Sequence, residues 1–188
     1  MKREWTMTAA VSAAMLVSGA LLAHDNGRST RFETDLKPTR EVPALSSVAS
    51  GKFKARIDEA NQMITYELSY ADLEGSVLQA HIHVGQAGVN GGISVFLCGN
   101  PPTVPPAPVP QPPACPAPPA TVTGTLSPAN IIGPAAQGVA PTSDTVNEFA
   151  ELVRAIRSGV TYANVHSSKF PGGEIRGQVK EDHGRGKH

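Results

Sequence analysis

GVTYANVHSSKFPGGEIRGQVK, residues 159–180, is the stretch that decides the fold. Small or apolar residues alternate with polar ones over 161–166, and the alternation resumes over 174–179. The PGG at 171–173 between them suits a tight reversal, because proline fixes φ and glycine accepts a positive φ. The stretch therefore predicts two antiparallel strands joined by a turn.

A second stretch, QAHIHVGQAGVNGG at residues 79–92, has the same strand-and-turn character. Successive side chains of a strand point to opposite faces of the sheet. Ala80, Ile82 and Val84 then share one face, and His81 and His83 lie together on the other. Two imidazoles on one face are the most suggestive chemical feature of the chain.

The remaining pattern is also typical of β structure. Residues 51–57 alternate between apolar and charged, and 62–70 return with the same period after a polar turn. A short strand is expected at 121–126. One helix is expected near residues 145–157, because Thr145 and Glu148 have capping-box spacing and apolar residues follow at helical intervals. The sequence predicts an all-β fold, an antiparallel sandwich or partly closed barrel of about eight strands with one short helix.

The termini suggest an exported single domain. Residues 1–23 combine a basic start with an apolar run and small residues before a cleavage point, as in a secretory signal peptide. The run is short for a membrane span, which needs about 20 apolar residues. We expect one domain over residues 24–180, a disordered charged tail over 181–188, no membrane contact after cleavage, and a secreted or periplasmic location.

A proline-rich insertion at residues 99–119 interrupts the domain. Eight of the sixteen residues between Cys98 and Cys115 are proline, so this loop cannot form a helix or a regular ladder. In an exported chain with two cysteines, a disulfide is the default interpretation, against two free thiols or a metal-binding pair. The loop itself is either a tolerated insertion or a proline-rich ligand for a partner protein.

Three blocks of the sequence resemble the signature blocks of the CHRD domain, a module named after chordin. They are LKPTREVPALSSVASGKFKARID at 36–58, AHIHVGQAGVNGG at 80–92 and YANVHSSKFPGGEIRGQV at 162–179, in the order that the family has them. The resemblance spans roughly residues 32–180. It implies an extracellular β-rich module, and it carries over no catalytic residues.

The histidines support a metal hypothesis. Alternate residues of a strand have Cα atoms about 6.5 Å apart, so His81 and His83 can reach one ion. If the two signature strands are neighbours, His166 supplies a third nitrogen and Asn164 can hold a ligand ring from behind. Three imidazoles suit copper or zinc. The alternative is a hydrogen-bonded polar pair that braces the sheet beside Asn164 and Glu174.

Charge and motifs exclude several function classes. Sixteen basic and sixteen acidic residues give no reason to expect a nucleic-acid partner. The chain has no nucleophile elbow, phosphate-binding glycine loop or HExxH motif. Glu174 and Arg176, two apart on one strand, are expected to form a structural ion pair.

We therefore expect a non-catalytic, exported CHRD-type binding or structural module, whose partner is an unidentified extracytoplasmic protein or ligand. The alternative is a copper- or zinc-binding protein that uses His81, His83 and His166. AHIHVG is also similar to the metal-binding strand of copper/zinc superoxide dismutases, which makes dismutase-like activity a variant of that alternative. Against this variant, the segments expected to be ordered hold fewer histidines than a two-metal site requires.

Overall fold

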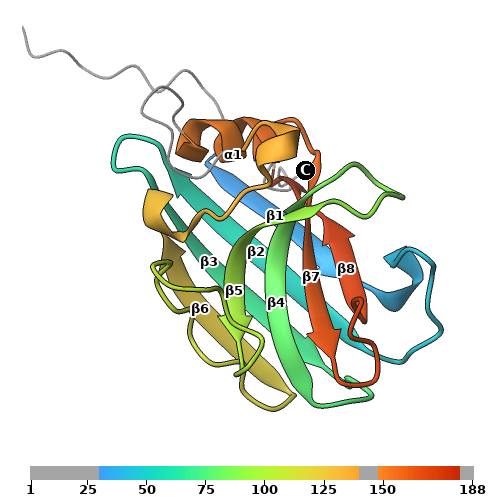
Figure 1. Ribbon diagram of the computed structural model, residues 1–188. Coiled ribbons are helices and arrows are strands. Elements are labelled where there is room, and N and C mark those ends of the chain that lie inside the picture. The colour runs from blue at the N-terminus through green and yellow to red at the C-terminus, as the bar shows by residue number, and fades with distance from the viewer. Residues whose placement is uncertain (1–29, 140–147, 183–188) are drawn as a thin grey trace, which may run out of the picture.

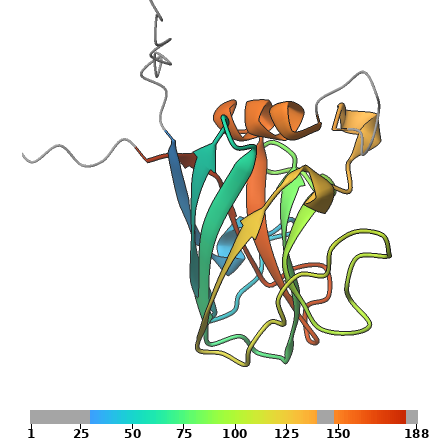
Figure 2. The same ribbon diagram turned by 90° about the vertical axis from the view of Figure 1, so that its left-hand side faces the viewer.

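The computed structural model describes residues 30–139 and 148–182. The predicted signal peptide and Thr145 of the predicted capping box lie outside these residues. Within them, two antiparallel β-sheets face each other, with the second sheet in front of the first in Figure 1 and the two layers seen from the side in Figure 2. None of the helices in this part of the chain is long and apolar enough to cross a membrane.

In residues 30–139 and 148–182, nine strands form the two sheets. The first sheet has the order β6-β3-β2-β1-β9 and the second has the order β5-β4-β7-β8. The strands are β1 (Arg31–Leu36), β2 (Ser50–Asp58), β3 (Met63–Ala71), β4 (Val77–Val84), β5 (Gly92–Gly99), β6 (Ala120–Leu126), β7 (Thr161–Ser167), β8 (Ile175–Gln178) and β9 (Lys180–Glu181). The sheets do not close into a barrel, so of the two predicted architectures the sandwich is confirmed.

The core lies between the inner faces of the sheets. Phe53 and Leu68 from the first sheet and Ile82 and Val165 from the second are almost completely buried there. Along β2 and β3 every second residue is buried in this way, which is the alternation seen in the sequence. The helix α1 (Glu148–Arg157) lies across one end of the sandwich and buries its apolar stripe (Figures 1 and 2).

Both predicted hairpins are present. Strands β2 and β3 pair in register from Asp58 with Met63 to Ser50 with Ala71. Strands β7 and β8 pair across the turn that contains Gly173, whose φ of 125° explains the glycine. Strand β9 includes Glu181, which pairs with Phe32 of β1 and so adds one residue to the sheet beyond the predicted domain boundary.

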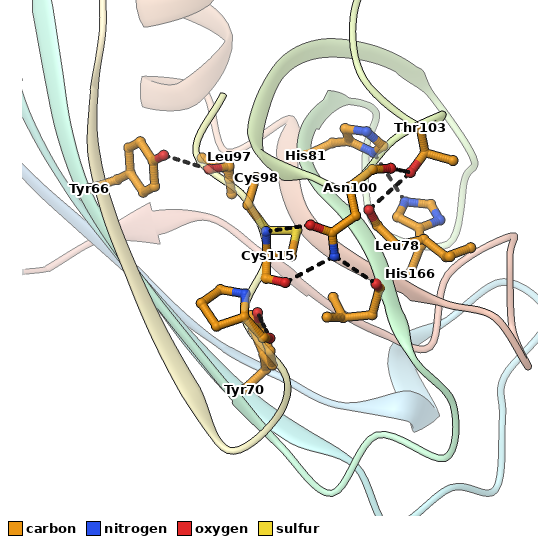
Figure 3. Close-up of a disulfide and its surroundings, with 12 residues drawn as sticks. Tyr66, Tyr70, Leu78, His81, Leu97, Cys98, Asn100, Thr103, Cys115 and His166 are labelled. Carbon is orange, nitrogen blue, oxygen red and sulfur yellow. Dashed lines mark hydrogen bonds between the residues drawn. A yellow bond between two sulfur atoms is a disulfide. The ribbon is translucent and has the colours of Figure 1, made fainter. Parts of the chain in front are cut away.

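The predicted disulfide between Cys98 and Cys115 is confirmed (Figure 3). It closes the proline-rich segment at the end of β5. The buried hydroxyl of Tyr66 donates a hydrogen bond to Leu97 O at 2.5 Å, which ties β3 of the first sheet to β5 of the second (Figure 3). Tyr70 donates to Pro116 O at 2.6 Å and fixes the return of the loop. The insertion is therefore anchored at its base.

The outer face of the second sheet is polar, yet it is buried. The side chains on this face come from β4, β7, β8 and the adjoining turn, and all of them are buried: His81, His83, Tyr162, Asn164, His166, Glu174 and Arg176. Three segments cover this face and bond to it: residues 37–49 after β1, the turn 85–91 after β4, and the turn 168–173 after β7. Water would normally cover such a polar face, but here it forms a second buried layer, made of polar side chains.

Candidate metal centre

The structure brings the three predicted histidines together. Strands β4 and β7 are antiparallel neighbours, with His81 opposite Asn164 and His166 opposite Gln79. His83 lies two residues beyond His81 on the same face. One ring nitrogen from each of the three imidazoles can be chosen so that all lie within 4.8 Å of one another. The two strands that carry the histidines are therefore neighbours, as the metal hypothesis assumed.

All three imidazoles are shielded from water. His81 is 0% exposed, while His83 and His166 are 7% and 6% exposed. The centre therefore lies just beneath the surface, with His81 at the inner side and the other two rings at the rim. Polar groups this deeply buried normally need hydrogen-bond partners, so the partners of each ring nitrogen are informative.

Two backbone carbonyls fix the protonation of His83 and His166. His83 Nδ1 lies 3.0 Å from Gly91 O, and His166 Nδ1 lies 2.9 Å from Pro171 O. A carbonyl oxygen only accepts, so each Nδ1 carries the proton and donates it. Each Nε2 is then left with a free lone pair. This arrangement, with one nitrogen held from behind and the other bare, is the usual one for histidines that bind metals.

His81 completes the cluster. Its Nδ1 lies 3.1 Å from His166 Nε2, and Figure 3 shows the two rings joined by this contact. Because His166 Nε2 is an acceptor, His81 Nδ1 carries the shared proton in the metal-free protein. His81 Nε2 and His83 Nε2 have no hydrogen-bond partner although both are buried. Such orphaned nitrogens lower stability unless something else engages them.

The environment keeps the imidazoles neutral. Burial lowers the pKa of His81 to about 2, with further lowering by His166 and His83. Burial also lowers the pKa of His83 to about 4, although its hydrogen bond to Gly91 acts in the opposite direction. The pKa of His166 is lowered mainly by burial as well. Neutral imidazole is the form that binds metal ions, so no proton has to leave at neutral pH for coordination to His83 and His166.

Aromatic rings hold the cluster from the sides. The Phe96 ring meets His81 edge-on, with centroids 4.3 Å apart. The Tyr162 ring stacks on His83 at 4.7 Å with nearly parallel planes, and the Arg176 guanidinium lies 4.4 Å from the centre of the Tyr162 ring. The imidazole orientations are thus constrained by packing as well as by hydrogen bonds.

The predicted ion pair between Glu174 and Arg176 does not form. Arg176 Nε instead donates to Glu41 Oε2 at 2.6 Å, and its other nitrogens donate to Asn90 Oδ1 and Val89 O. Glu174 Oε1 accepts from Ser47 Oγ and from Glu74 N. Both side chains are buried by the covering segments. Each forms its hydrogen bonds with other groups rather than with the other side chain.

The expected support of a ligand ring by Asn164 is also absent. Asn164 Nδ2 donates to Glu41 Oε1 at 2.6 Å and to Ile175 O, and neither of these bonds goes to a histidine. It therefore links the ion pair of Glu41 and Arg176 to the strand rather than orienting an imidazole. The role of Glu41 was not predicted. A lone glutamate between two prolines gives no sign that it will pair with Arg176, which lies 135 residues further along the chain.

Taken together, the fold and the site define a class: an antiparallel β-sandwich with a three-histidine cluster under one sheet. The chain belongs to the CHRD domain family, whose model matches residues 32–179. This membership supports a binding or structural module, in agreement with the resemblance of the three sequence blocks. Comparison with curated proteins and with solved structures gave no match.

Proposed function

We propose that this CHRD domain protein is an extracytoplasmic metal-binding module that holds one copper or zinc ion on His81, His83 and His166. The observation that carries the proposal is the convergence of three neutral, buried imidazoles, two of which are oriented by backbone carbonyls. The disulfide is compatible with a secreted location, where copper and zinc are the ions that imidazole sites take.

One nitrogen–nitrogen distance in the cluster already matches this role. Two nitrogens bound to one tetrahedral ion at the usual imidazole distance lie about 3.3 Å apart. His81 Nδ1 and His166 Nε2 are 3.1 Å apart in the metal-free protein. If the proton on His81 Nδ1 moved to His81 Nε2, His81 would stay neutral and an ion could bind between Nδ1 and His166 Nε2. His83 Nε2 would then turn from an orphaned atom into a ligand. The protein's part is to position the three rings and to exclude water.

Two other candidate functions have less support. Partner binding through an apolar surface would need a contiguous patch, and the described segments expose three large apolar side chains, Val48, Met63 and Val89. Dismutase-like activity would need a second metal and a free arginine. Arg176, the arginine beside the cluster, is held by Glu41.

The test is a copper and zinc titration of the full chain, expressed for export and purified without a histidine tag. We compare the wild type with His81→Leu, which keeps a similar volume in the sheet and removes one ligand. The matched control is Gln79→Ala, on the same face of β4 but outside the cluster. We expect one ion per chain in the wild type and the control, and at least a 100-fold weaker affinity in His81→Leu, since one of three ligands is lost.

Circular dichroism and urea unfolding check that each variant is folded. Failure of the folded, oxidised wild type to bind either ion would refute the metal-binding proposal. Equal binding by His81→Leu and wild type would place the ion elsewhere and refute it as well.

A further inference from the structure

We propose that the three-histidine site selects monovalent copper and discriminates against zinc. This inference rests on the proposed metal-binding function and specifies its ligand. Its basis is the distribution of charge around the cluster, which offers no negative ligand to offset the charge of a divalent ion.

The ligand set itself carries no negative charge. The cluster consists of three neutral imidazoles, and among the described residues no carboxylate or thiolate joins the group of nitrogens that lie within 4.8 Å of one another. A divalent ion on these ligands would keep its full charge of two, whereas copper(I) would bring a charge of one. A carboxylate or thiolate ligand would have neutralised part of that charge.

The groups behind the ligands are neutral as well. His83 and His166 donate to the backbone carbonyls of Gly91 and Pro171. In many metal sites a carboxylate occupies this position and adds negative charge through the ring. Here the carbonyl dipoles orient the rings without adding any net charge.

The charged side chain packed beside the cluster is positive. The Arg176 guanidinium lies 4.4 Å from the centre of the Tyr162 ring, and that ring stacks on His83. The carboxylate of Glu41 is engaged by Arg176 and Asn164 rather than by a histidine. An added cation therefore meets an environment that already disfavours positive charge.

Burial makes this difference in charge decisive. The cost of moving an ion from water into a medium of low dielectric constant rises with the square of its charge, so a divalent ion pays about four times as much as a monovalent one of similar size. With His81 0% exposed and the other two rings nearly covered, water offers little compensation. Copper(I) also accepts three ligands, whereas zinc in proteins takes four or more.

The experiment measures both affinities on the untagged, oxidised full chain without oxygen. Copper(I) is supplied with bicinchoninate as the competing chelator, and zinc(II) is supplied with a colorimetric zinc chelator. We expect copper(I) to bind at least about 100-fold more tightly than zinc(II). X-ray absorption of the copper-loaded protein is expected to show three nitrogen neighbours and no sulfur.

Each outcome is informative. Zinc bound as tightly as copper(I), or more tightly, overturns the inference and leaves the metal-binding function intact. Failure to bind either ion overturns both. Copper(I) bound through sulfur places the ion at the cysteines and also overturns the inference.

A charge-changing pair of variants tests the physical reason. His83→Glu adds a carboxylate at the rim of the cluster, and His83→Gln is its neutral counterpart of similar size. If charge sets the selectivity, zinc binds at least about tenfold more tightly to the glutamate variant than to the glutamine variant, while copper(I) gains less. An equal gain for both ions contradicts the charge argument. The wild-type comparison remains decisive if either variant fails to fold.

Discussion

At the scale of single residues, the charges of Glu41 and Arg176 can lie under the covering segments because the two side chains pair with each other. The side chains of Glu41 and Arg176 are 3% and 7% exposed, and the two atoms in contact are 2.6 Å apart. Burial raises the pKa of Glu41, while Arg176 and Asn164 act to lower it. Arg176 further donates to Asn90 Oδ1 at 2.7 Å. The pair therefore joins two covering segments to β8.

We predict that Glu41→Gln destabilises the protein by about 3 kcal/mol or more, because it leaves a buried guanidinium without its counter-charge. Urea unfolding at pH 7 measures this free energy. The control is Glu33→Gln, which removes one of the partners of Lys52, in a pair whose side chains are both 40% exposed. That change is expected to cost less than about 1 kcal/mol.

Equal costs for the two variants would show that Arg176 reaches water once Glu41 is neutral. A double variant, Glu41→Gln with Arg176→Met, is expected to recover part of the loss, since it removes the unpaired charge. If the double variant is less stable than Glu41→Gln alone, the contacts of Arg176 with Asn90 and Tyr162 outweigh its charge.

At the scale of elements, the proline-rich loop is fastened by more than its disulfide. Asn100 Nδ2 donates to Val77 O and to Cys115 O, and Asn100 Oδ1 accepts from Cys115 N (Figure 3). Thr103 Oγ1 donates to Leu78 O. These bonds attach the start of the loop to β4 a few residues before His81. The loop therefore keeps a defined path across the end of the sheet.

We predict that Cys98→Ala with Cys115→Ala lowers the free energy of unfolding by about 2–3 kcal/mol, the loss expected for a loop of this length with stiffening prolines. The affinity for metal should change less than about threefold, since the asparagine bonds still hold the loop. Adding Asn100→Ala should then cost a further 1 kcal/mol or more, roughly. A large loss of metal affinity in the double cysteine variant would show that the disulfide holds the cluster together.

Strand alternation explains how much of the site could be predicted. The period of two along β4 and β7 was enough to put His81 and His83 on one face and to make His166 their candidate partner. The covering of that face was not predictable, because segments 37–49 and 85–91 have no periodic pattern and reach it through scattered long-range hydrogen bonds. Gly91 and Pro171 were not predicted either, because they contribute backbone carbonyl oxygens, which every residue has.

At the scale of the whole molecule, the sandwich carries an apolar interior and a polar one. The apolar core between the sheets supplies the stability of the fold, as in other sandwiches. The polar layer under the covering segments includes two orphaned imidazole nitrogens and Glu174 Oε2, which also lacks a partner. A layer that holds unpartnered buried atoms lowers stability, which is the usual sign of a site kept for binding.

This polar interior gives the metal-free protein a definite response to acid. The pKa values of His81 and His83 are lowered to about 2 and about 4 in the folded state, and that of His166 is also lowered. Unfolded histidines titrate near 6.5, so below that pH the unfolded state binds more protons and stability falls as the pH falls. Above pH 6.5 these groups contribute no pH dependence. The raised pKa of Glu41 has the opposite effect on stability, because the folded state then holds its proton more tightly than the unfolded state. Glu41 is one such group, whereas three histidines act in the other direction.

We predict that urea unfolding of the metal-free protein shows a loss on the order of 3 kcal/mol for each of His81 and His83 between pH 6.5 and pH 4, with a further loss from His166 in the same direction. The contribution of His83 should level off near pH 4, and that of His81 should continue toward pH 2. His81→Leu, in which one of these groups is gone, should show a shallower slope by up to about 1.4 kcal/mol per pH unit. A slope that is unchanged in His81→Leu would mean that the imidazoles reach water before the protein unfolds, and that the covering segments open locally in acid.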